Sequence, residues 1–314
     1  MGAEENLDLS QLLANSAELA APARATLMSI VSRLCGGLTA FPRALLQRPL
    51  QGIRDGTSAR SLVSAQLAAA AANAVAADKE LVKLAAEAYI PEEIRKLRNK
   101  ARIAVAAAED FSTENSQTAA EPDEDWLNKF IRYAEDASSE RLQTLFGKIL
   151  SGEVKRPGSF SPATLRAVSE LTQELASDFE WAWKRCIEDE VWRGPDLSRG
   201  DGWNRLTRLR DAGLMSPVAS SVHQPAFRPD TLYSPWIFGR IPHPHLVLEM
   251  TRASGLEIPV VNFTSVGAEI GKLLPEPDIE ANLLQVAGSI NRSSVAKITL
   301  LRSDGTTSLL WEAP

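Results

Sequence analysis

The sequence predicts a mainly α-helical protein in which several helices precede a small α+β part at the C-terminal end. Apolar residues recur every three or four positions over most of the N-terminal and central chain, which is the period of amphipathic helices. Toward the C-terminus the apolar residues cluster instead in short extended runs. Two of these runs flank Asp304-Gly305, a pattern typical of a β-hairpin.

Breaks in these patterns divide the chain into five predicted segments. Proline, glycine and runs of small polar residues mark most of the boundaries. The segments are a helical N-terminal region at 1–111, a linker or loop at 112–122, a central helical domain at 123–194, a winged-helix-like module at 195–274, and a helix with a β-hairpin at 275–314.

The composition is that of a globular protein with an ample core. The chain has 314 residues, of which 44% are hydrophobic and 24% are charged. A formal net charge of -6 argues against wholesale binding to nucleic acid or to an anionic membrane, although a local basic patch is compatible with it. Cys35 and Cys186 are interpreted as reduced core residues. The acidic N-terminus and the lack of a long apolar run lead us to expect a cytoplasmic protein.

The first 50 residues are predicted to be helical but interrupted. Leucines near the start indicate a short first helix, and residues 26–50 form an apolar stretch broken by two glycines and two prolines. We interpret residues 26–50 as a broken helical pair packed on its domain. The alternative is peripheral membrane contact, because three arginines of this stretch lie among apolar residues such as Phe41 and Leu45.

An alanine-rich helix is predicted from residue 57 to residue 89. Alanine has the highest intrinsic helix propensity, but its side chain buries little apolar area. Two interpretations stay open, a tightly packed internal helix and a self-association surface. The residues chosen to represent that surface are Ala69, Ala72 and Ala76, with Phe41 and Leu45.

A further helix is expected to begin at Pro91, since proline suits the first turn of a helix. Glu92 and Glu93 follow at its positive end, and residues 94–108 combine an apolar stripe with a basic run. We interpret the basic run as a solvated face, with nucleic-acid contact as the alternative. Residues 112–121 are read as a linker because they are rich in small polar side chains.

Residues 123–165 contain the clearest helical pattern of the chain. Asp123, then Ser138 or Ser139, then Ser161 are expected to cap three amphipathic helices. Gly152 is expected to end the second of these helices.

The polar residues of this stretch admit two interpretations. In the first, Glu135 and Asp136 form a charged loop site with Glu153, Lys155 and Arg156. In the second, these side chains serve as caps, turns and solvated faces. Paired carboxylates act as general acid and base only where their environments separate their pKa values, so the second interpretation is preferred.

The same stretch carries the patterns D-x-D-W-L-x-x-F-x-x-Y-A-E-D-x-S and G-K-I-L-x-G-E-x-K-x-P-G-S-F-S. It resembles an uncharacterised bacterial family known only as a domain of unknown function, and is similar in style to the abortive-infection alpha proteins. The resemblance extends from about residue 92 to residue 274. It implies a bacterial cytoplasmic protein in phage defence, and it supplies no active site. The residues that carry it are Asp125, Trp126, Glu135, Asp136, Glu153, Lys155, Pro157, Gly158 and Phe160.

Two helices are predicted between residues 172 and 215. Thr172 is expected to cap the first, which continues to about Trp192 and ends at Gly194-Pro195. The second begins near residue 201 and ends at Gly213, before an extended region. This arrangement resembles a winged-helix module, in which such a helix enters the major groove. Its candidate nucleic-acid-binding residues are Arg205, Arg208 and Arg210; the alternative is a packing unit without nucleic acid.

The C-terminal part is predicted to mix strands and helices. Residues 246–249, 256–263, 296–303 and 306–312 are expected to be strands, and Pro259 predicts an edge or bulged position for the second. Thr264 is expected to cap one helix, and another spans residues 279–290. His243 and His245 could offer two nitrogen ligands to a metal, but a closed zinc site needs four ligands, so no metal is expected.

Nucleotide-binding and hydrolase motifs do not occur in the sequence, and neither a cofactor nor a small-molecule ligand is expected. We therefore expect a non-enzymatic effector that self-associates through its helices or binds a partner protein. One alternative is a regulator that binds nucleic acid through the winged-helix-like module. The other is an unrecognised hydrolase or nuclease.

Overall fold

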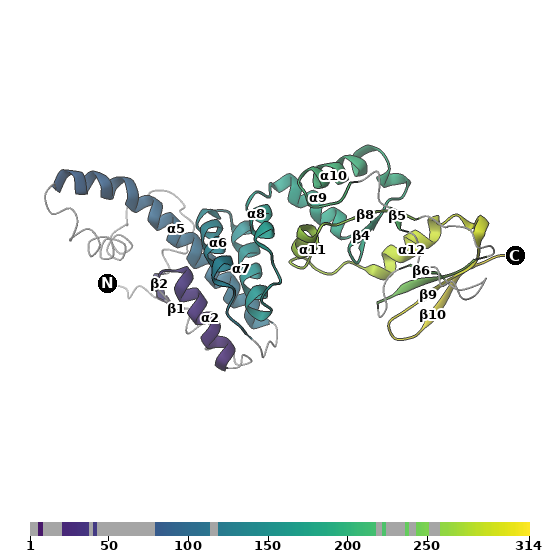
Figure 1. Cartoon of the computed structure of the whole chain (residues 1–314), viewed down its shortest axis with the longest axis horizontal. Coiled ribbons are helices and arrows are strands. Elements are labelled where there is room, and N and C mark those ends of the chain that lie inside the picture. The colour runs from purple at the N-terminus through teal and green to yellow at the C-terminus, as the bar shows by residue number, and fades with distance from the viewer. Residues whose placement is uncertain are drawn as a thin grey trace. The chain divides into compact units, whose positions relative to one another are not determined.

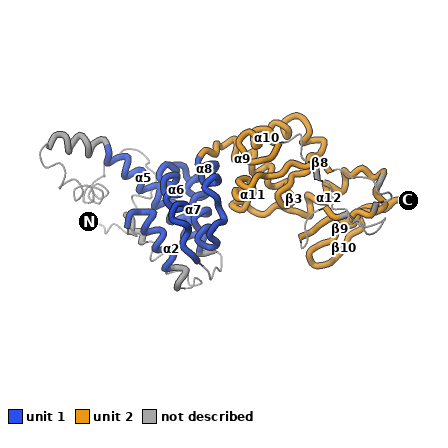
Figure 2. Tube along the Cα trace, in the orientation of Figure 1, with its two compact units in different colours: residues 1–169 blue, residues 170–314 orange. Residues whose placement is uncertain are grey.

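The structure is a computed structural model that describes residues 6–8, 21–37, 40–42, 79–113, 119–217, 222–223, 236–238, 243–250 and 258–314. It is mainly helical, with antiparallel sheets toward the C-terminal end, as the sequence predicts (Figure 1). The chain forms two compact units, unit 1 at Met1–Ser169 and unit 2 at Glu170–Pro314 (Figure 2). The finer division into five segments stays a prediction.

Unit 1 is a helical bundle in which α7 (Glu140–Lys155) lies along α5 (Lys79–Thr113). The two helices run in the same direction, because Gln143 near the start of α7 contacts Asn99 and Lys155 at its end contacts Asp110. The helices are α2 (Ala21–Leu34), α5 (Lys79–Thr113), α6 (Glu124–Asp136), α7 (Glu140–Lys155) and α8 (Pro162–Ser169), and the short strands are β1 (Asn6–Asp8) and β2 (Ala40–Pro42).

The predicted N-caps of unit 1 are confirmed. Asp123 Oδ1 accepts a hydrogen bond of 3.0 Å from the backbone N–H of Trp126. Ser139 Oγ accepts one of 3.3 Å from Leu142, which decides between the two serines at that turn. Ser161 caps α8 in the same way, and Pro162 occupies its first position. Short polar side chains thus satisfy backbone donors that the helix itself leaves unpaired.

Two predicted helix boundaries of unit 1 are wrong. α5 passes through Pro91 without a break, since a proline removes only one backbone hydrogen bond and the flanking residues continue the helix on both sides. α7 does not end at Gly152 and continues to Lys155. Gly152 instead makes room for a neighbour, because a Cβ there would lie 2.7 Å from the ring of Phe160.

The N-terminal predictions are also corrected where the structure describes this region. β1 occupies part of the expected first helix, and its Leu7 pairs with Phe41 of β2 inside the expected helical pair. Gly36 and Gly37 both have a positive φ, which glycine adopts without strain, and they turn the chain directly after α2. Ala69, Ala72, Ala76 and Leu45 lie outside the described residues.

Unit 2 contains two four-stranded antiparallel sheets. The first has the order β3 (Cys186–Ile187), β4 (Glu190–Trp192), β8 (Ile258–Asn262), β5 (Val222–His223). The second has the order β10 (Thr307–Glu312), β9 (Val295–Leu301), β7 (His245–Met250), β6 (Trp236–Phe238). The helices are α9 (Gln173–Trp183), α10 (Gly200–Asp211), α11 (Ser265–Gly271) and α12 (Ile279–Ser289), with 3-10 turns η1 (Pro195–Leu197) and η2 (Arg292–Ser294).

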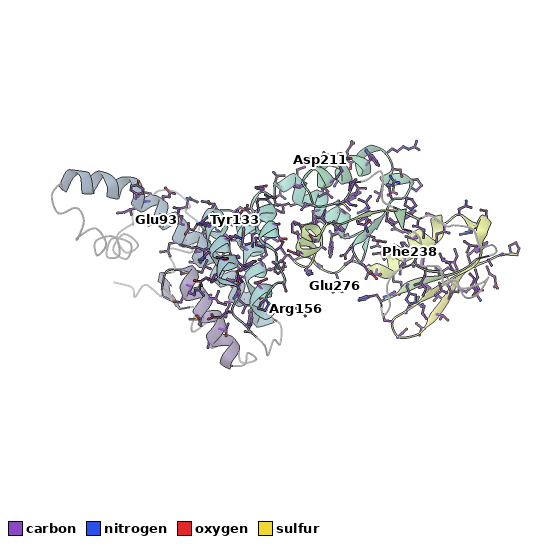
Figure 3. The ribbon with its side chains drawn as sticks, viewed as in Figure 1. Glu93, Tyr133, Arg156, Asp211, Phe238 and Glu276 are labelled. Atoms are coloured by element: carbon purple, nitrogen blue, oxygen red, sulfur yellow. The ribbon has the colours of Figure 1, made fainter. Side chains whose placement is uncertain are left out.

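The core of unit 2 forms where α12 packs against the second sheet. Leu283, Val286 and Ile290 of α12 contact the apolar residues on one face of β7 and β9, and Phe238 of β6 joins this cluster. Figure 3 locates Phe238 in this sheet. The caps predicted at Thr172 and Thr264 are confirmed by hydrogen bonds to the backbone of Leu175 and Gly267.

Two predictions for unit 2 need correction. The helix after Thr172 ends at Trp183 rather than at Trp192. β3 and β4 follow it, and they are joined by a turn in which Glu188 has φ 59°. β8 is an inner strand despite Pro259. The carbonyl of Pro259 accepts a hydrogen bond from the N–H of Arg193, which lies just past the end of β4. The backbone N–H that proline lacks would point to the same side of β8 as this carbonyl. Because β4 has already ended at that point, β8 loses little pairing at Pro259.

The predicted β-hairpin at Asp304-Gly305 is confirmed, with a longer loop than expected. Leu301 pairs with Thr307, and the N–H of Arg302 donates to the carbonyl of Thr306. Three residues therefore form the loop, and Gly305 takes the left-handed conformation at φ 84° that closes such a loop.

Candidate functional site

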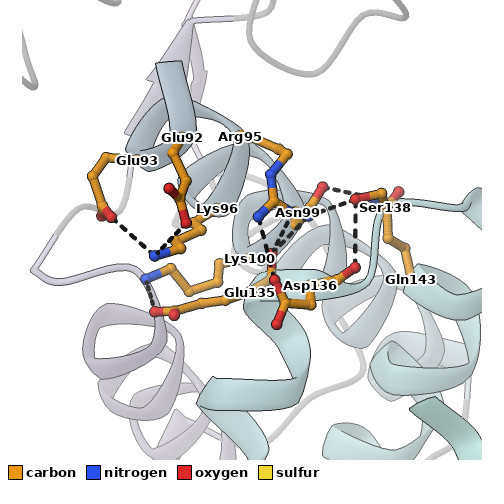
Figure 4. Close-up of polar contacts among 10 residues, drawn as sticks. All are labelled: Glu92, Glu93, Arg95, Lys96, Asn99, Lys100, Glu135, Asp136, Ser138 and Gln143. Carbon is orange, nitrogen blue, oxygen red and sulfur yellow. Dashed lines mark hydrogen bonds and ion pairs between the residues drawn. The ribbon is translucent and has the colours of Figure 1, made fainter. Parts of the chain in front are cut away.

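Two polar clusters lie at opposite ends of α7 in unit 1. The first, which we name the amide cluster, joins Asn99 of α5, Ser138 in the α6–α7 turn and Gln143 of α7 (Figure 4). Asn99 and Gln143 are 3% and 4% exposed. Gln143 Nε2 donates to Asn99 Oδ1 at 3.2 Å and to the carbonyl of Ala137 at 2.9 Å.

The amide cluster also satisfies the end of α6. Asn99 Nδ2 donates to the carbonyl of Glu135 at 2.8 Å and to Ser138 Oγ at 3.2 Å. Carbonyls in the last turn of a helix have no partner within the helix, so these amides take the place of water. The cluster therefore fixes the α6–α7 turn against α5.

Ion pairs surround the amide cluster and use the two neighbouring carboxylates at the end of α6, Glu135 and Asp136. Lys100 Nζ lies 3.0 Å from Glu135 Oε1, and Arg95 Nη2 lies 3.3 Å from Asp136 Oδ1 (Figure 4). Each pair links α5 to the end of α6. One turn earlier, hydrogen bonds from Lys96 to Glu93 and to Glu92 raise the pKa of its ammonium group. Glu135 and Asp136 thus act as docking contacts between helices.

The second cluster, which we name the loop clasp, closes the connection between α7 and α8. Glu153 is 2% exposed, and its two oxygens accept from the backbone N–H groups of Gly158 at 2.6 Å and Phe160 at 3.0 Å. The carbonyl of Phe160 accepts a hydrogen bond of 2.6 Å from the indole Nε1 of Trp126. Gly158 has φ 82°, where an L-residue would be strained.

The remaining residues of the predicted signature border the loop clasp or lie apart from it. Lys155 Nζ lies 3.6 Å from Asp110 Oδ2 of α5 and 5.4 Å from the centre of the Phe111 ring. Pro157 and Asp125 are exposed, the first in the α7–α8 turn and the second in the first turn of α6. Arg156, labelled in Figure 3, directly follows α7 and is exposed.

The single charged site considered from the sequence does not form in the described structure. Glu135 and Asp136 lie beside the first turn of α7, and Glu153 lies near its last turn. The helix between them spans roughly 20 Å at 1.5 Å per residue. Each group has its own partners, so the two ends stabilise the bundle separately.

In unit 2 the three candidate arginines of α10 lie beside carboxylates. Asp178 of α9, whose side chain is 3% exposed, lies 3.4 Å from Arg205 Nη1 and 2.7 Å from Arg208 Nε. Arg205 also pairs with Asp201 at 2.7 Å, and Arg210 pairs with Asp211 at 2.7 Å. The hydrogen bond to Asp178 is the main reason why the pKa of Arg208 is raised.

Trp181 of α9 contacts two arginines through its ring, one of them Arg205 of α10. The guanidinium carbons of Arg185 and Arg205 lie 4.5 Å and 5.3 Å from its ring centre. Trp183, two positions on, is instead buried against Phe179 and Phe263 and donates from Nε1 to the carbonyl of Pro275. The charges of α10 therefore bind α9 to α10.

Sequence reasoning missed Asn99, Gln143 and Asp178, which organise these contacts. Each lies at or beside a predicted apolar stripe, as Asp178 does between Leu175 and Phe179. A polar residue at a buried helical position needs a partner, and that is the signal by which all three could have been found.

Neither thiol is poised for reaction. Burial raises the pKa of Cys35 and that of Cys186 to about 12. The Nδ1 atom of His245, which is 4% exposed, lies 2.9 Å from the carbonyl oxygen of His243. Within the described residues, no three His, Cys, Asp or Glu side chains gather where they could hold a metal ion. Among the described helices none has both the length and the apolar character needed to cross a bilayer.

A family comparison matches part of the chain. Residues 89–188 match a family described as a protein of unknown function (DUF2806). The matched range begins within α5, includes both the amide cluster and the loop clasp, and ends in the β3–β4 turn of unit 2. Comparison with curated proteins and with solved structures found no match.

Proposed function

We propose that the chain is a non-enzymatic interaction protein that self-associates through the N-terminal end of α5. The observation that carries this proposal is the length of α5, which has 35 residues whereas α7, packed along it, has 16. From Tyr89 onward, where the side chains of α5 are described, polar contacts with the other described helices begin at Arg95. The part before Arg95 would extend about 24 Å at 1.5 Å per residue.

The exposure of Tyr89 supports an interaction role for this part of α5. Its side chain is 63% exposed, one of the few large apolar side chains so exposed among the described residues. A helix of this length is only marginally stable in water without packing. A second copy of α5 would supply that packing, and the alanine-rich segment that precedes α5 in the sequence is expected to contribute.

Light scattering across a concentration series tests the proposal. We expect wild-type protein to increase in mass with concentration and the Tyr89→Glu variant to stay at the monomer mass. Asn128→Glu, at an exposed position of α6, introduces the same charge and is expected to behave as wild type. A monomer at every concentration would remove the proposal.

The similarity in style to abortive-infection alpha proteins suggests phage defence as the setting for this self-association. The similarity lies in the helices that carry the amide cluster and the loop clasp. The test is phage infection of bacteria that express the protein. Protection by wild type that is lost in Tyr89→Glu and kept in Asn128→Glu supports the setting, and no protection by wild type contradicts it.

A second candidate, binding of nucleic acid, is favoured by the order of elements in unit 2. In chain order α9 is followed by β3, β4, η1, α10 and β5, and β8 comes after β6 and β7 of the other sheet; within its own sheet β8 lies between β4 and β5. A helix, a strand, two helices and two strands in this arrangement resemble a winged-helix module. α10 would then take the place of the recognition helix.

Charge makes this second candidate weaker than self-association. Arg205 and Arg208 already pair with Asp178, and residues 170–314 carry 14 Lys and Arg against 19 Asp and Glu. A gel shift at low salt that is lost in the Arg205→Gln and Arg208→Gln variants would support binding. No shift of either duplex or single-stranded DNA would remove it.

A further inference from the structure

Helix α5 contains a proline, Pro91, well inside its length. A proline has no backbone N–H, so the helix provides no donor for the carbonyl of Glu87, and the proline ring crowds the same carbonyl. The residue before a proline is also disfavoured in the helical conformation, and here that residue is the β-branched Ile90. Pro91 is therefore a weak point in α5.

The residues after Pro91 do not depend on the helix before it. Proline suits the first position of a helix, and Glu92 and Glu93 suit its positive end. Lys96 Nζ lies 3.1 Å from Glu92 Oε1 and 3.1 Å from Glu93 Oε1, so two ion pairs form within this turn. Contacts with the end of α6 begin at Arg95. A helix that began at Pro91 would keep all of these contacts.

Residues 79–90 gain little from a helix that continues through Pro91. Among the side chains of α5 that the structure describes, those from Tyr89 onward, polar contacts with the other described helices begin only at Arg95. Tyr89 is itself 63% exposed. Residues 79–90 span roughly 18 Å at 1.5 Å per residue, and a helix of that length is marginal in water without packing. These contacts therefore do not offset the cost of the proline in a single copy of the chain.

We propose that Pro91 is a hinge that couples helix formation in residues 79–90 to self-association of the chain. The inference rests on the proposed function, in which this part of α5 pairs with a second copy. In a single copy the helix begins at Pro91. Pairing packs residues 79–90 against the partner and so stabilises the helix that runs on through the proline, which is the form of α5 in the structure. Because only the helical form can pair, the hinge lowers the affinity of association.

Two proline substitutions separate the hinge from a general effect of losing a proline. Pro91→Ala restores a donor to the carbonyl of Glu87, so it should favour the continuous helix and lower the dissociation constant about tenfold or more. Pro162→Ala is the matched control, because Pro162 is the exposed first residue of α8, where a proline costs no hydrogen bond. We expect this control to associate as wild type does.

The test is hydrogen–deuterium exchange of the full chain at low and high protein concentration, with dissociation constants from sedimentation. Exchange is followed over residues 83–90, because the first four N–H groups of a helix have no partner within it. We expect wild type to exchange fast when dilute and slowly when associated. Tyr89→Glu, which should stay a monomer, is expected to exchange fast at every concentration. Dilute Pro91→Ala should exchange more slowly than dilute wild type.

Three results would overturn the hinge. One is slow exchange over residues 83–90 in dilute wild type and in Tyr89→Glu, which would mean that the helix is continuous in a single copy. Another is fast exchange in associated wild type. The third is a dissociation constant for Pro91→Ala that is no lower than that for Pro162→Ala.

Self-association through α5 is judged separately, by whether the mass rises with concentration in wild type and not in Tyr89→Glu. A wild-type chain that stays a monomer at every concentration removes both proposals. A chain that associates but gives any of the three results above removes only the hinge.

Discussion

Gln143 of α7 donates a hydrogen bond of 3.2 Å to Asn99 of α5, and both side chains are buried. The pair lies 44 positions apart in the sequence, and its remaining hydrogen bonds go to backbone carbonyls around the end of α6. One contact between two amides therefore joins three helices.

Replacing Gln143 by methionine is expected to lower the free energy of unfolding by roughly 2–3 kcal/mol, because Asn99 Oδ1 and the carbonyl of Ala137 lose a buried donor. Chemical denaturation measures the change. Thr144→Ala, one position on at an exposed site, is expected to stay within about 0.5 kcal/mol of wild type. Equal effects of the two variants would contradict the structural role of the amide cluster.

The loop clasp predicts that Glu153→Gln loses one of the two hydrogen bonds that hold the connection between α7 and α8. A glutamine side chain has one acceptor oxygen, so its amide group would face the N–H of Gly158 or of Phe160. We expect a loss of roughly 1–3 kcal/mol and faster proteolysis after residue 155. Asp125→Asn alters an exposed carboxylate in the first turn of α6 and should leave both measurements near wild type.

Replacing Ser151 is expected to increase the free energy of unfolding, unlike the two preceding substitutions. Its side chain is 0% exposed, and Oγ has no hydrogen-bond partner in the structure. A buried hydroxyl without a partner is costly, so Ser151→Ala should raise the free energy of unfolding by about 1 kcal/mol. Ser159→Ala removes a hydroxyl that donates to the carbonyl of Arg156 at 2.6 Å and should not stabilise. A loss of stability in Ser151→Ala would show that the hydroxyl has a partner in solution.

Asp178→Asn should weaken the packing of α9 on α10. The variant removes the buried charge that faces both Arg205 and Arg208, at an expected cost of roughly 1–3 kcal/mol. Asp201→Asn changes a carboxylate whose side chain is 74% exposed and should cost less than about 0.5 kcal/mol. Thermal unfolding of the two variants side by side decides whether Asp178 holds these helices together.

The buried thiols predict how stability varies at alkaline pH. Burial raises the pKa of Cys35 and of Cys186 from 9.0 to about 12, so the folded state favours the protonated thiols. Their contribution is complete below pH 9, where both states are protonated, and is lost as the pH rises toward 12. The measurement is the slope of the unfolding free energy between these limits. The Cys35→Ala, Cys186→Ala double variant should show a shallower slope, and an unchanged slope would contradict the burial of the thiols.

The features predicted correctly from the sequence are mostly local. The sequence predicts caps at Asp123, Thr172 and Thr264 correctly because a short polar side chain acts on a backbone group only three residues away. The hairpin at Asp304-Gly305 follows from the same kind of local preference, although its loop has one residue more than predicted.

The missed features depend on partners that are distant in the sequence. Residues 186–192 form strands because Val191 pairs with Val261, which no periodicity within the segment can reveal. The sequence makes Arg208 a candidate contact for nucleic acid and does not reveal its partner Asp178, which lies 30 positions earlier. The backbone at Glu188, with φ 59°, likewise reflects the pairing of β3 with β4 rather than a preference of glutamate.

Gly147 sets the separation of α5 and α7, since a Cβ at this position would lie 2.6 Å from Cβ of Ala106 and 2.9 Å from the backbone nitrogen of Ala107. Gln143 reaches α5 one turn before this point, and Lys155 reaches it two turns after. Any side chain at position 147 would therefore push the helices apart and lengthen the distances from Gln143 to Asn99 and from Lys155 to Asp110, although it would contact none of these residues. Because glycine carries only a hydrogen atom in place of a side chain, α5 and α7 lie close enough for the contacts at both ends of α7 to form.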